Sequence, residues 1–235
     1  MKSIEHWTKE VPILNKKIGY IFRDQKLLME ALTHSSFANE WKNKRIPNNE
    51  RLEFLGDSVL GLVISRHIFH TYQNLPEGEL TKVRASVVCE ASLAKKAREL
   101  MLGEHILLGK GEEASGGNNR DSILADAMEA LIAALYIDGK YEKASEFVIN
   151  HFEDIIKLAV HGELMKDYKT LLQEKVQRFN PSSIEYVVVK EKGPDHSKVF
   201  YVDVRSDSKI LGSGSGRNKK EAEQNAAKAA IQYLF

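Results

Sequence analysis

The sequence predicts two domains of different fold class, an all-α domain followed by a small α+β domain of order α-β-β-β-α. Up to about residue 159, apolar residues recur every three or four positions, which is typical of amphipathic helices. Farther along, β-branched and aromatic runs alternate with polar turns, which is typical of strands. We therefore expect domains over residues 1–159 and 166–235, joined by a linker over residues 160–165.

Helical spacing in the first domain predicts helices over residues 11–18, 25–32, 49–71, 77–89, 91–101, 122–136 and 143–158. Polar segments at residues 37–48 and 109–119 are expected to be exposed loops. In the second domain we expect a helix at 167–179, strands at 184–189, 199–204 and 209–212, and a closing helix at 219–234. The glycines from 212 to 216 are expected in a loop. They lack the Walker A order, so no nucleotide site is expected.

The composition of the 235-residue chain is 43% hydrophobic and 29% charged, which excludes disordered, collagen-like and disulfide-rich proteins. A single cysteine, Cys89, allows neither an intrachain disulfide nor a cysteine-based zinc site. The longest apolar stretch, residues 130–137, is far shorter than the roughly 18 residues that cross a bilayer, and the first residues do not resemble a secretory signal. We therefore expect a cytoplasmic protein without membrane contact. From residue 163 onward the chain has 13 basic and 10 acidic residues, a weak indication of an anionic partner.

Three carboxylates share one face of the helix predicted at 49–71. At about 100° per residue, Glu50, Glu53 and Asp57 fall within roughly 60° of arc. The rest of this helix is apolar nearly all round, so we expect it in the interior of the domain. The helix predicted at 122–136 has only two charged residues, Asp126 and Glu129, one turn apart. Two such faces packed together would gather hard oxygen ligands suited to Mg²⁺ or Mn²⁺, and phosphate chemistry is the natural use of such a site.

Other interpretations of these residues remain open. The acids could form internal salt bridges with Arg51, Arg84 or Arg120. Glu77 follows a proline at a helix start, where an acid commonly interacts with the helix dipole. His34 has no evident nucleophilic partner, so a structural hydrogen-bonding role is expected for it.

The second domain carries polar and basic residues suited to a nucleic-acid backbone. Basic residues near a helix N-terminus are electrostatically unfavourable, because they oppose the helix dipole. Binding of backbone phosphates would explain why basic residues precede the last helix. Polar side chains on the first helix suit hydrogen bonds to ribose 2′-hydroxyls, and the loop near residue 196 could enter a minor groove. The candidate RNA contacts are Thr170, Gln173, Glu174, Gln177, His196, Arg217, Asn218, Lys219 and Lys220. An ordinary solvated surface is the alternative.

The stretch Asn49-Glu-Arg-Leu-Glu-Phe-Leu-Gly-Asp57 resembles the signature of the ribonuclease III family, and Asp126-Ala-Met-Glu129 is similar to that family's second acidic motif. Residues 169–174, 193–196 and 216–223 resemble a double-stranded RNA-binding domain. The resemblance covers nearly the whole chain. It implies a dimeric endonuclease that cuts both strands of duplex RNA, leaving 5′-phosphate and 3′-hydroxyl ends with a short 3′ overhang. Processing of ribosomal RNA precursors, messenger RNA and other structured RNAs is implied as well.

The resemblance also assigns roles to the acids. Glu53, Asp126 and Glu129 would bind Mg²⁺, for which Mn²⁺ could substitute. Asp57 would bind the metal or position the catalytic water, and Glu50 and Glu77 would be further catalytic residues of an acidic valley. The alternatives are a catalytically silent duplex-RNA binder on the same fold, a metal-dependent phosphohydrolase acting on small nucleotides, and a purely structural helical dimer.

Overall fold

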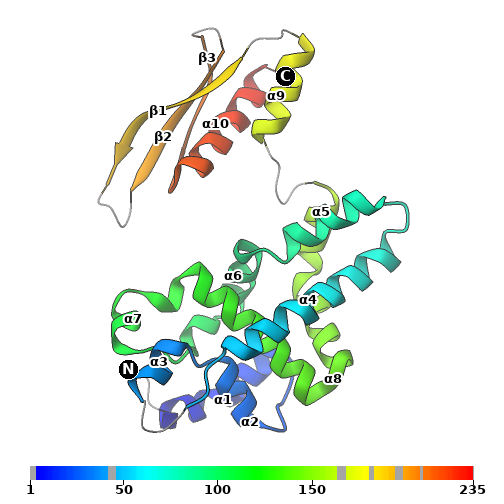
Figure 1. Ribbon diagram of the computed structural model, residues 1–235, viewed down its shortest axis with the longest axis vertical. Helices are drawn as coiled ribbons and strands as arrows, with labels where there is room; N and C mark the ends of the chain where they lie inside the picture. Colours follow the sequence, from blue (N-terminus) through cyan, green and yellow to red (C-terminus); the bar gives the residue numbers. More distant parts are fainter. Residues whose placement is uncertain are drawn as a thin grey trace. The chain divides into compact units, whose positions relative to one another are not determined.

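The chain, seen here in a computed structural model, divides into two compact units, Met1–Leu164 and Met165–Phe235 (Figure 1). The structure describes residues 4–41, 46–162, 168–179, 183–193, 198–206 and 209–234. The first unit is helical and the second has the order α-β-β-β-α, so the predicted fold class is confirmed. Over the described residues, no helix is both long and apolar enough to span a membrane.

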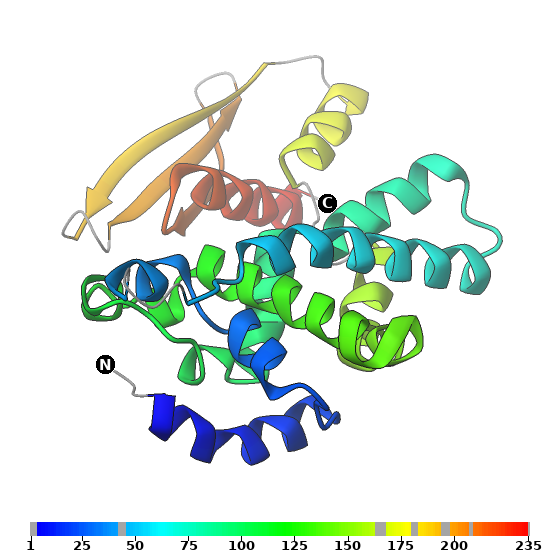
Figure 2. The same ribbon diagram turned by 60° about the horizontal axis from the view of Figure 1, so that its bottom comes forward.

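The first unit is built around two long helices, α4 and α8, which lie against each other in both ribbon views (Figures 1 and 2). The α-helices of this unit are α1 (Ile4–Ile18), α2 (Gln25–Ala31), α3 (Ser35–Glu40), α4 (Glu50–Thr71), α5 (Glu77–Val87), α6 (Glu90–Glu99), α7 (Lys110–Ala114) and α8 (Asp121–Val160). The segments expected to be loops at 37–48 and 109–119 thus include the end of α3, all of α7 and a short 3-10 turn, η3 (Gly117–Asn119). Short helices of this kind lack the length that makes helical periodicity visible in a sequence.

Helix α8 is interrupted at Lys140, whose backbone angles of φ 63° and ψ −176° are not helical. The two halves correspond to the separate helices predicted at 122–136 and 143–158. The first half is buried nearly all round, from Ile123 to Leu135. A helix in this position can carry only those polar groups whose cost of burial is compensated.

Gly56 sets the distance between α4 and α8. A Cβ atom at this position would lie 1.9 Å from the carbonyl oxygen of Glu129, so no other residue type fits without moving one helix. The close approach brings the acidic turn of α4 beside the acidic turn of α8.

The expectation that α4 is buried all round is wrong. Its inner face is buried, with Leu60 and Ile64 fully covered, but Phe54 is 80% exposed, Leu62 58% and Phe69 64%. Their spacing places these three apolar residues within about 80° of arc on one side of the helix. The sequence identifies apolar residues, but it does not say whether this chain or another surface covers them.

In the second unit, helices α9 (Tyr168–Phe179) and α10 (Lys219–Leu234) cover one face of an antiparallel sheet (Figure 1). The strands are β1 (Ile184–Lys192), β2 (Val199–Ser206) and β3 (Lys209–Gly216), with β2 in the centre. Val202 and Val204 of β2 pack with Leu172 of α9 and with alanines of α10.

Strand β3 is longer than predicted and includes the glycines expected in a loop. Gly212, Gly214 and Gly216 alternate with Ser213 and Ser215, so every second position lies against α10. A Cβ atom at Gly214 would lie 2.2 Å from the backbone nitrogen of Ala226. The glycines therefore permit close packing of a helix on the sheet rather than forming a flexible loop.

Candidate active site

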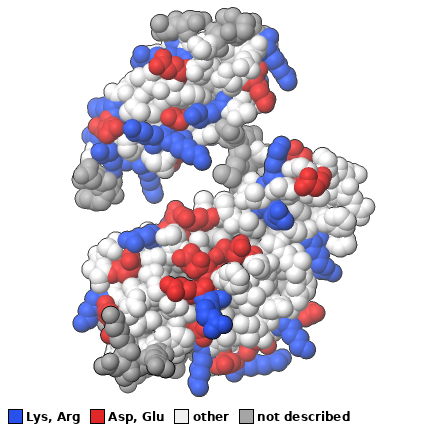
Figure 3. Space-filling model, viewed as in Figure 1, with Lys and Arg blue, Asp and Glu red and all other residues white. Residues whose placement is uncertain are grey.

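The acidic residues predicted on α4 occupy its first two turns. Glu53 is half-buried, whereas Glu50 and Asp57 are exposed. Asp126 and Glu129, one turn apart on α8, are half-buried among fully buried neighbours such as Met128 and Ala130. Figure 3 shows acidic side chains gathered on one face of the first unit. The sequence correctly placed two sets of acids on separate helices, and the contact between Gly56 and Glu129 brings these helices together.

Glu129 is at the centre of this group electrostatically. Burial, together with the charges of Asp57, Glu53 and Asp126, raises the pKa of Glu129 to about 8. Burial and the charges of Asp126 and Glu50 likewise raise the pKa of Glu53. Like charges held together out of water disfavour ionisation, so the group is costly unless protons or a cation neutralise it. We call Glu50, Glu53, Asp57, Asp126 and Glu129 the acidic cluster.

The arginines proposed as alternative partners do not neutralise the acidic cluster. Arg120 pairs with Glu112 at 2.6 Å, and Arg84 donates a hydrogen bond to Ser65. The charge of Arg51 acts on Glu30, where burial raises the pKa and Arg51 opposes the rise. Within the described parts of the chain, no ion pair joins a lysine or arginine to a member of the acidic cluster. The salt-bridge interpretation therefore lacks its expected partners.

The acidic cluster has the donor chemistry of a divalent-cation site. In the described residues, no three His, Cys, Asp or Glu side chains converge closely enough to hold a metal ion. The donor set still fits Mg²⁺, because all five groups are hard carboxylate oxygens and Glu129 lies in an environment that favours added positive charge. Ligation by these residues therefore remains a proposal.

Two further residues act on Asp126, and neither was assigned to the site from the sequence. Burial raises the pKa of Asp126, the nearby His34 lowers it, and Glu90 at the start of α6 raises it further. The sequence predicts only a structural role for His34 and gives no indication for Glu90. No local signal in the sequence relates either residue to Asp126, because the electrostatic interaction depends on how separate helices pack.

The hydrogen bond of the Glu77 side chain is within its own helix rather than with the acidic cluster. It begins α5, and its carboxylate accepts a hydrogen bond of 2.9 Å from the hydroxyl of Thr81. It is absent from the charges that shift the pKa values of Glu53, Asp126 and Glu129. Its catalytic role therefore rests on the resemblance alone.

The predicted RNA contacts of the second unit lie on two elements. Thr170, Glu174 and Gln177 are exposed on α9, and Gln173 on the same helix is half-buried. Arg217, Asn218, Lys219 and Lys220 are exposed around the start of α10, and Figure 3 shows basic side chains on the visible face of this unit. His196 lies outside the described residues.

The start of α10 is more fully hydrogen-bonded than expected. The side chain of Asn218 accepts from the backbone N–H of Glu221, and the Glu221 carboxylate accepts from the N–H of Arg217. These are capping interactions, so those amides are used by the fold rather than free for phosphate. The basic side chains remain as the groups that can contact an anion.

Both units match known families. A Ribonuclease-III-like family model matches residues 24–156, and a double-stranded RNA binding motif model matches residues 168–234. The chain is 52% identical to Ribonuclease 3 of Caldanaerobacter subterraneus subsp. tengcongensis, with 94% of this chain and 96% of that protein covered. The chain belongs to the ribonuclease III family. Ribonuclease 3 of Clostridium perfringens is 49% identical, with 94% of this chain and 92% of that protein covered.

Solved structures of the ribonuclease III nuclease domain from Campylobacter jejuni resemble the first unit. One is 43% identical, has a TM-score of 0.56, and covers 66% of this chain and 96% of that domain. Another is 44% identical, has a TM-score of 0.56, and covers 60% of this chain and 94% of that domain. That structure shows structural flexibility in a region involved in dimer formation.

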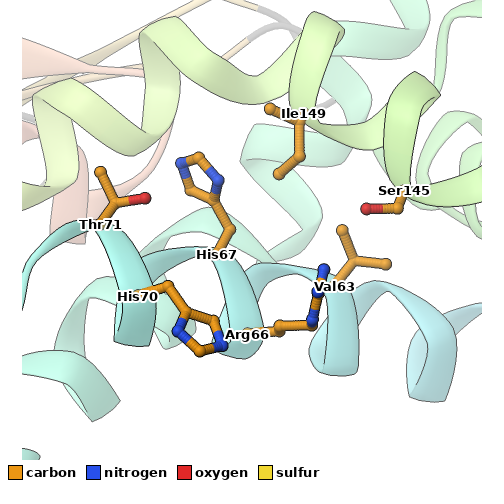
Figure 4. A pocket seen from close by; sticks show the side chains of 7 residues that line it. All are labelled: Val63, Arg66, His67, His70, Thr71, Ser145 and Ile149. Carbon is orange, nitrogen blue, oxygen red and sulfur yellow. The ribbon is translucent and has the colours of Figure 1, made fainter. Parts of the chain in front are cut away.

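A hollow of about 370 Å³ in this ribonuclease III chain lies between α4 and the second half of α8. Figure 4 shows Ser145 and Ile149 approaching from α8 and the other lining residues on α4. The lining residues are Val63, Arg66, His67, His70, Thr71, Ser145 and Ile149. None belongs to the acidic cluster, so this hollow is separate from the candidate active site.

Proposed function

We propose that the chain is an endoribonuclease that hydrolyses phosphodiester bonds of double-stranded RNA with Mg²⁺, leaving 5′-phosphate and 3′-hydroxyl ends with a short 3′ overhang. The observation that carries this proposal is the acidic cluster, in which Glu129 is half-buried beside three other carboxylates. Among the described residues, no lysine or arginine forms an ion pair with Glu129. Membership of the ribonuclease III family and the second unit's match to a double-stranded RNA binding motif support the same substrate.

The proposed metal ligands are Glu53, Asp126 and Glu129, with Asp57 as a further ligand or as the group that positions the attacking water. A bound divalent cation lowers the pKa of water and neutralises charge on the phosphate. The chain itself supplies the arrangement of acids: Gly56 lets α4 lie against α8, and the buried first half of α8 fixes the backbone of Asp126 and Glu129. Glu50, on the exposed edge of the cluster, and Glu77 are proposed to organise metal or substrate.

We assign substrate recognition to the second unit. Polar groups on α9 suit 2′-hydroxyls, which distinguish RNA from DNA, and the basic residues before α10 suit backbone phosphates. Neither set reads base edges. This arrangement supports recognition of duplex shape, consistent with processing of ribosomal RNA precursors and other structured RNAs.

We further propose a homodimer formed through α4. Phe54, Leu62 and Phe69 make an exposed apolar stripe on this helix, which a second copy of the chain would cover. The related nuclease domain from Campylobacter jejuni has a region involved in dimer formation, which supports a dimer of this chain but does not locate its interface.

The deciding experiment uses purified protein with end-labelled duplex RNA, with and without Mg²⁺, beside single-stranded RNA and duplex DNA. We expect metal-dependent cutting of duplex RNA alone. Binding without cutting would instead support the catalytically silent RNA-binding alternative. Failure to bind long duplex RNA, with hydrolysis of small nucleotides, would support a phosphohydrolase.

A further inference from the structure

The hollow between α4 and the second half of α8 gathers groups that can donate hydrogen bonds to an anion. Helix α4 contributes Arg66, His67, His70 and Thr71, and α8 contributes Ser145 from the other side (Figure 4). No acidic residue lines the hollow, and its volume of about 370 Å³ is within the range of small-ligand sites. The hollow therefore offers a small anion both the space and the donors that it needs.

Arg66 supplies a cation that the fold does not neutralise. Within the part of the chain that the structure describes, Arg66 has no ion pair, whereas Arg120 pairs with Glu112 at 2.6 Å. The Arg66 guanidinium lies 5.7 Å from the ring centroid of Tyr141 on α8, a contact that holds it beside the second helix. This ring contact leaves the guanidinium N–H groups available to an anion.

The two hydroxyl groups of the lining are also unused by the fold. A hydroxyl within a helix often donates to the carbonyl one turn earlier, as the hydroxyl of Ser86 does to Lys82 at 2.9 Å. Thr71 and Ser145 make no side-chain hydrogen bond with another described residue. In Figure 4 their oxygen atoms turn inward on either side of His67. Two donors from different helices therefore face the same space.

The acids nearest to the hollow are compensated or distant. Oε2 of Glu153 lies 3.5 Å from Nε2 of His67, but Oε1 of Glu153 pairs with Lys157 at 3.0 Å. Asp57, the last member of the acidic cluster on α4, precedes Arg66 by nine residues, or roughly 14 Å along the helix axis. That distance exceeds the roughly 8 Å over which charges act at physiological ionic strength. Repulsion of an anion by these acids is therefore weak.

We propose that the hollow between α4 and α8 binds a phosphate group through Arg66, Thr71 and Ser145, with His67 and His70 beside it. A guanidinium with its N–H groups available is well suited to phosphate oxygens, and the hydroxyls add neutral donors. The same chemistry serves a free phosphate and a backbone phosphate of RNA, and the experiment separates these two sources. The inference goes beyond the proposed function, because no residue of the hollow belongs to the acidic cluster.

Electrostatic support of α4 is the alternative explanation for the basic residues. Cations near the C-terminus of a helix interact favourably with its dipole, and Arg66, His67 and His70 lie in the last two turns of α4. This explanation accounts for the charge but not for a hydroxyl brought to the same hollow from α8. Substitution of Ser145 therefore distinguishes the two explanations.

The test is a titration of the full chain in EDTA with inorganic phosphate at constant pH, followed through the ring NMR signals of His67 and His70. Chloride at equal ionic strength controls for screening. The test variants are Arg66→Gln and Ser145→Ala, and Arg23→Gln, at an exposed arginine outside the hollow, is the matched control. The affinity of each variant for duplex RNA is measured under the same metal-free conditions.

We expect phosphate to shift both histidine signals saturably, and chloride to leave them in place. Arg66→Gln should lose about 10- to 100-fold in phosphate affinity, because a hydrogen bond to a charged group is removed, and Ser145→Ala about 2- to 10-fold. Arg23→Gln should bind phosphate as the wild type does. A parallel loss of duplex affinity in the two test variants would identify an RNA phosphate as the ligand, and unchanged duplex affinity would identify a free phosphate.

A wild-type protein whose histidine signals do not shift saturably, or shift equally with chloride, would overturn the proposal. Wild-type phosphate affinity in Arg66→Gln would overturn it as well. Wild-type affinity in Ser145→Ala would do the same, because the basic residues would then act through α4 alone. Since no measurement depends on cleavage, these outcomes are independent of whether the proposed nuclease activity is found.

Discussion

At the scale of the residue, the central feature is a carboxylate placed where ionisation is unfavourable. Glu129 is on a helix segment whose neighbours are almost entirely buried, and the carboxylates nearest to it raise its pKa further. A protein that needed only stability would place an apolar residue there. This cost supports the proposal that Glu129 binds a cation, because a bound cation would relieve the repulsion between the carboxylates.

The raised pKa of Glu129 predicts how stability depends on pH in metal-free protein. The folded pKa is about 8 and the ordinary value 4.5, so between these pH values the folded state retains a proton that the unfolded state has released. Stability should therefore fall as pH rises through this window. Glu129→Gln should be more stable than wild type by about 1–3 kcal/mol above pH 8, after allowance for solvent screening, and equal to it near pH 4. Urea unfolding in EDTA measures the difference, with Glu142→Gln at an exposed site of α8 as control. A constant difference at all pH values would contradict the assignment.

Glu129→Gln should also separate chemistry from binding. We expect cleavage of duplex RNA to fall by at least about 10³-fold, because the neutral amide removes the negative charge with which the carboxylate would hold a divalent cation. Duplex affinity should stay within about threefold, since the assigned RNA contacts are in the second unit. Cleavage assays and electrophoretic mobility shifts provide the two measurements. A variant with near-normal turnover would remove Glu129 from the catalytic group.

At the scale of the element, the sequence was informative about which residues share a face and less informative about what lies against that face. Helical spacing correctly grouped Glu50, Glu53 and Asp57 and identified the second pair on α8. It did not reveal that Phe54 is exposed or that His34 acts on Asp126, because both depend on packing between distant segments. The glycines of β3 were misassigned to a loop for the same reason, since their purpose is contact with α10.

Gly56 provides a test of how helix packing builds the site. Gly56→Ala forces a methyl group against the Glu129 carbonyl, so α4 and α8 must move apart. We expect a loss of about 3 kcal/mol or more in stability and a severe loss of cleavage. Gly78→Ala on α5, where an added methyl meets nothing within 4 Å, should change stability by no more than about 1 kcal/mol and leave cleavage intact. Thermal unfolding distinguishes the two variants, and equal stability would mean that the helices do not need this close approach.

At the scale of the whole molecule, the exposed stripe on α4 predicts association. Leu62→Glu places a charge in the proposed interface and should shift the protein from dimer to monomer at micromolar concentration, as measured by sedimentation velocity. Ile21→Glu is the matched control, because Ile21 is also exposed, at 78%, but lies outside α4. If Leu62→Glu remains as associated as the wild type, the stripe is not the interface.

The proposed assignment of catalysis to the first unit and RNA binding to the second predicts a specific salt dependence of duplex affinity. Lys219 and Lys220 are exposed at the start of α10, and each phosphate that they neutralise should release condensed counterions when the duplex binds. The double substitution to alanine should weaken duplex binding and reduce the slope of log affinity against log salt by about 1–2, while cleavage at saturating RNA persists. Lys209→Ala, at the opposite end of β3 and roughly 20 Å away by strand length, should leave the slope unchanged. Loss of positive charge in general would affect Lys209→Ala as well as the double variant. An equal change of slope in both variants would therefore mean that Lys219 and Lys220 attract RNA at a distance without contacting its phosphates.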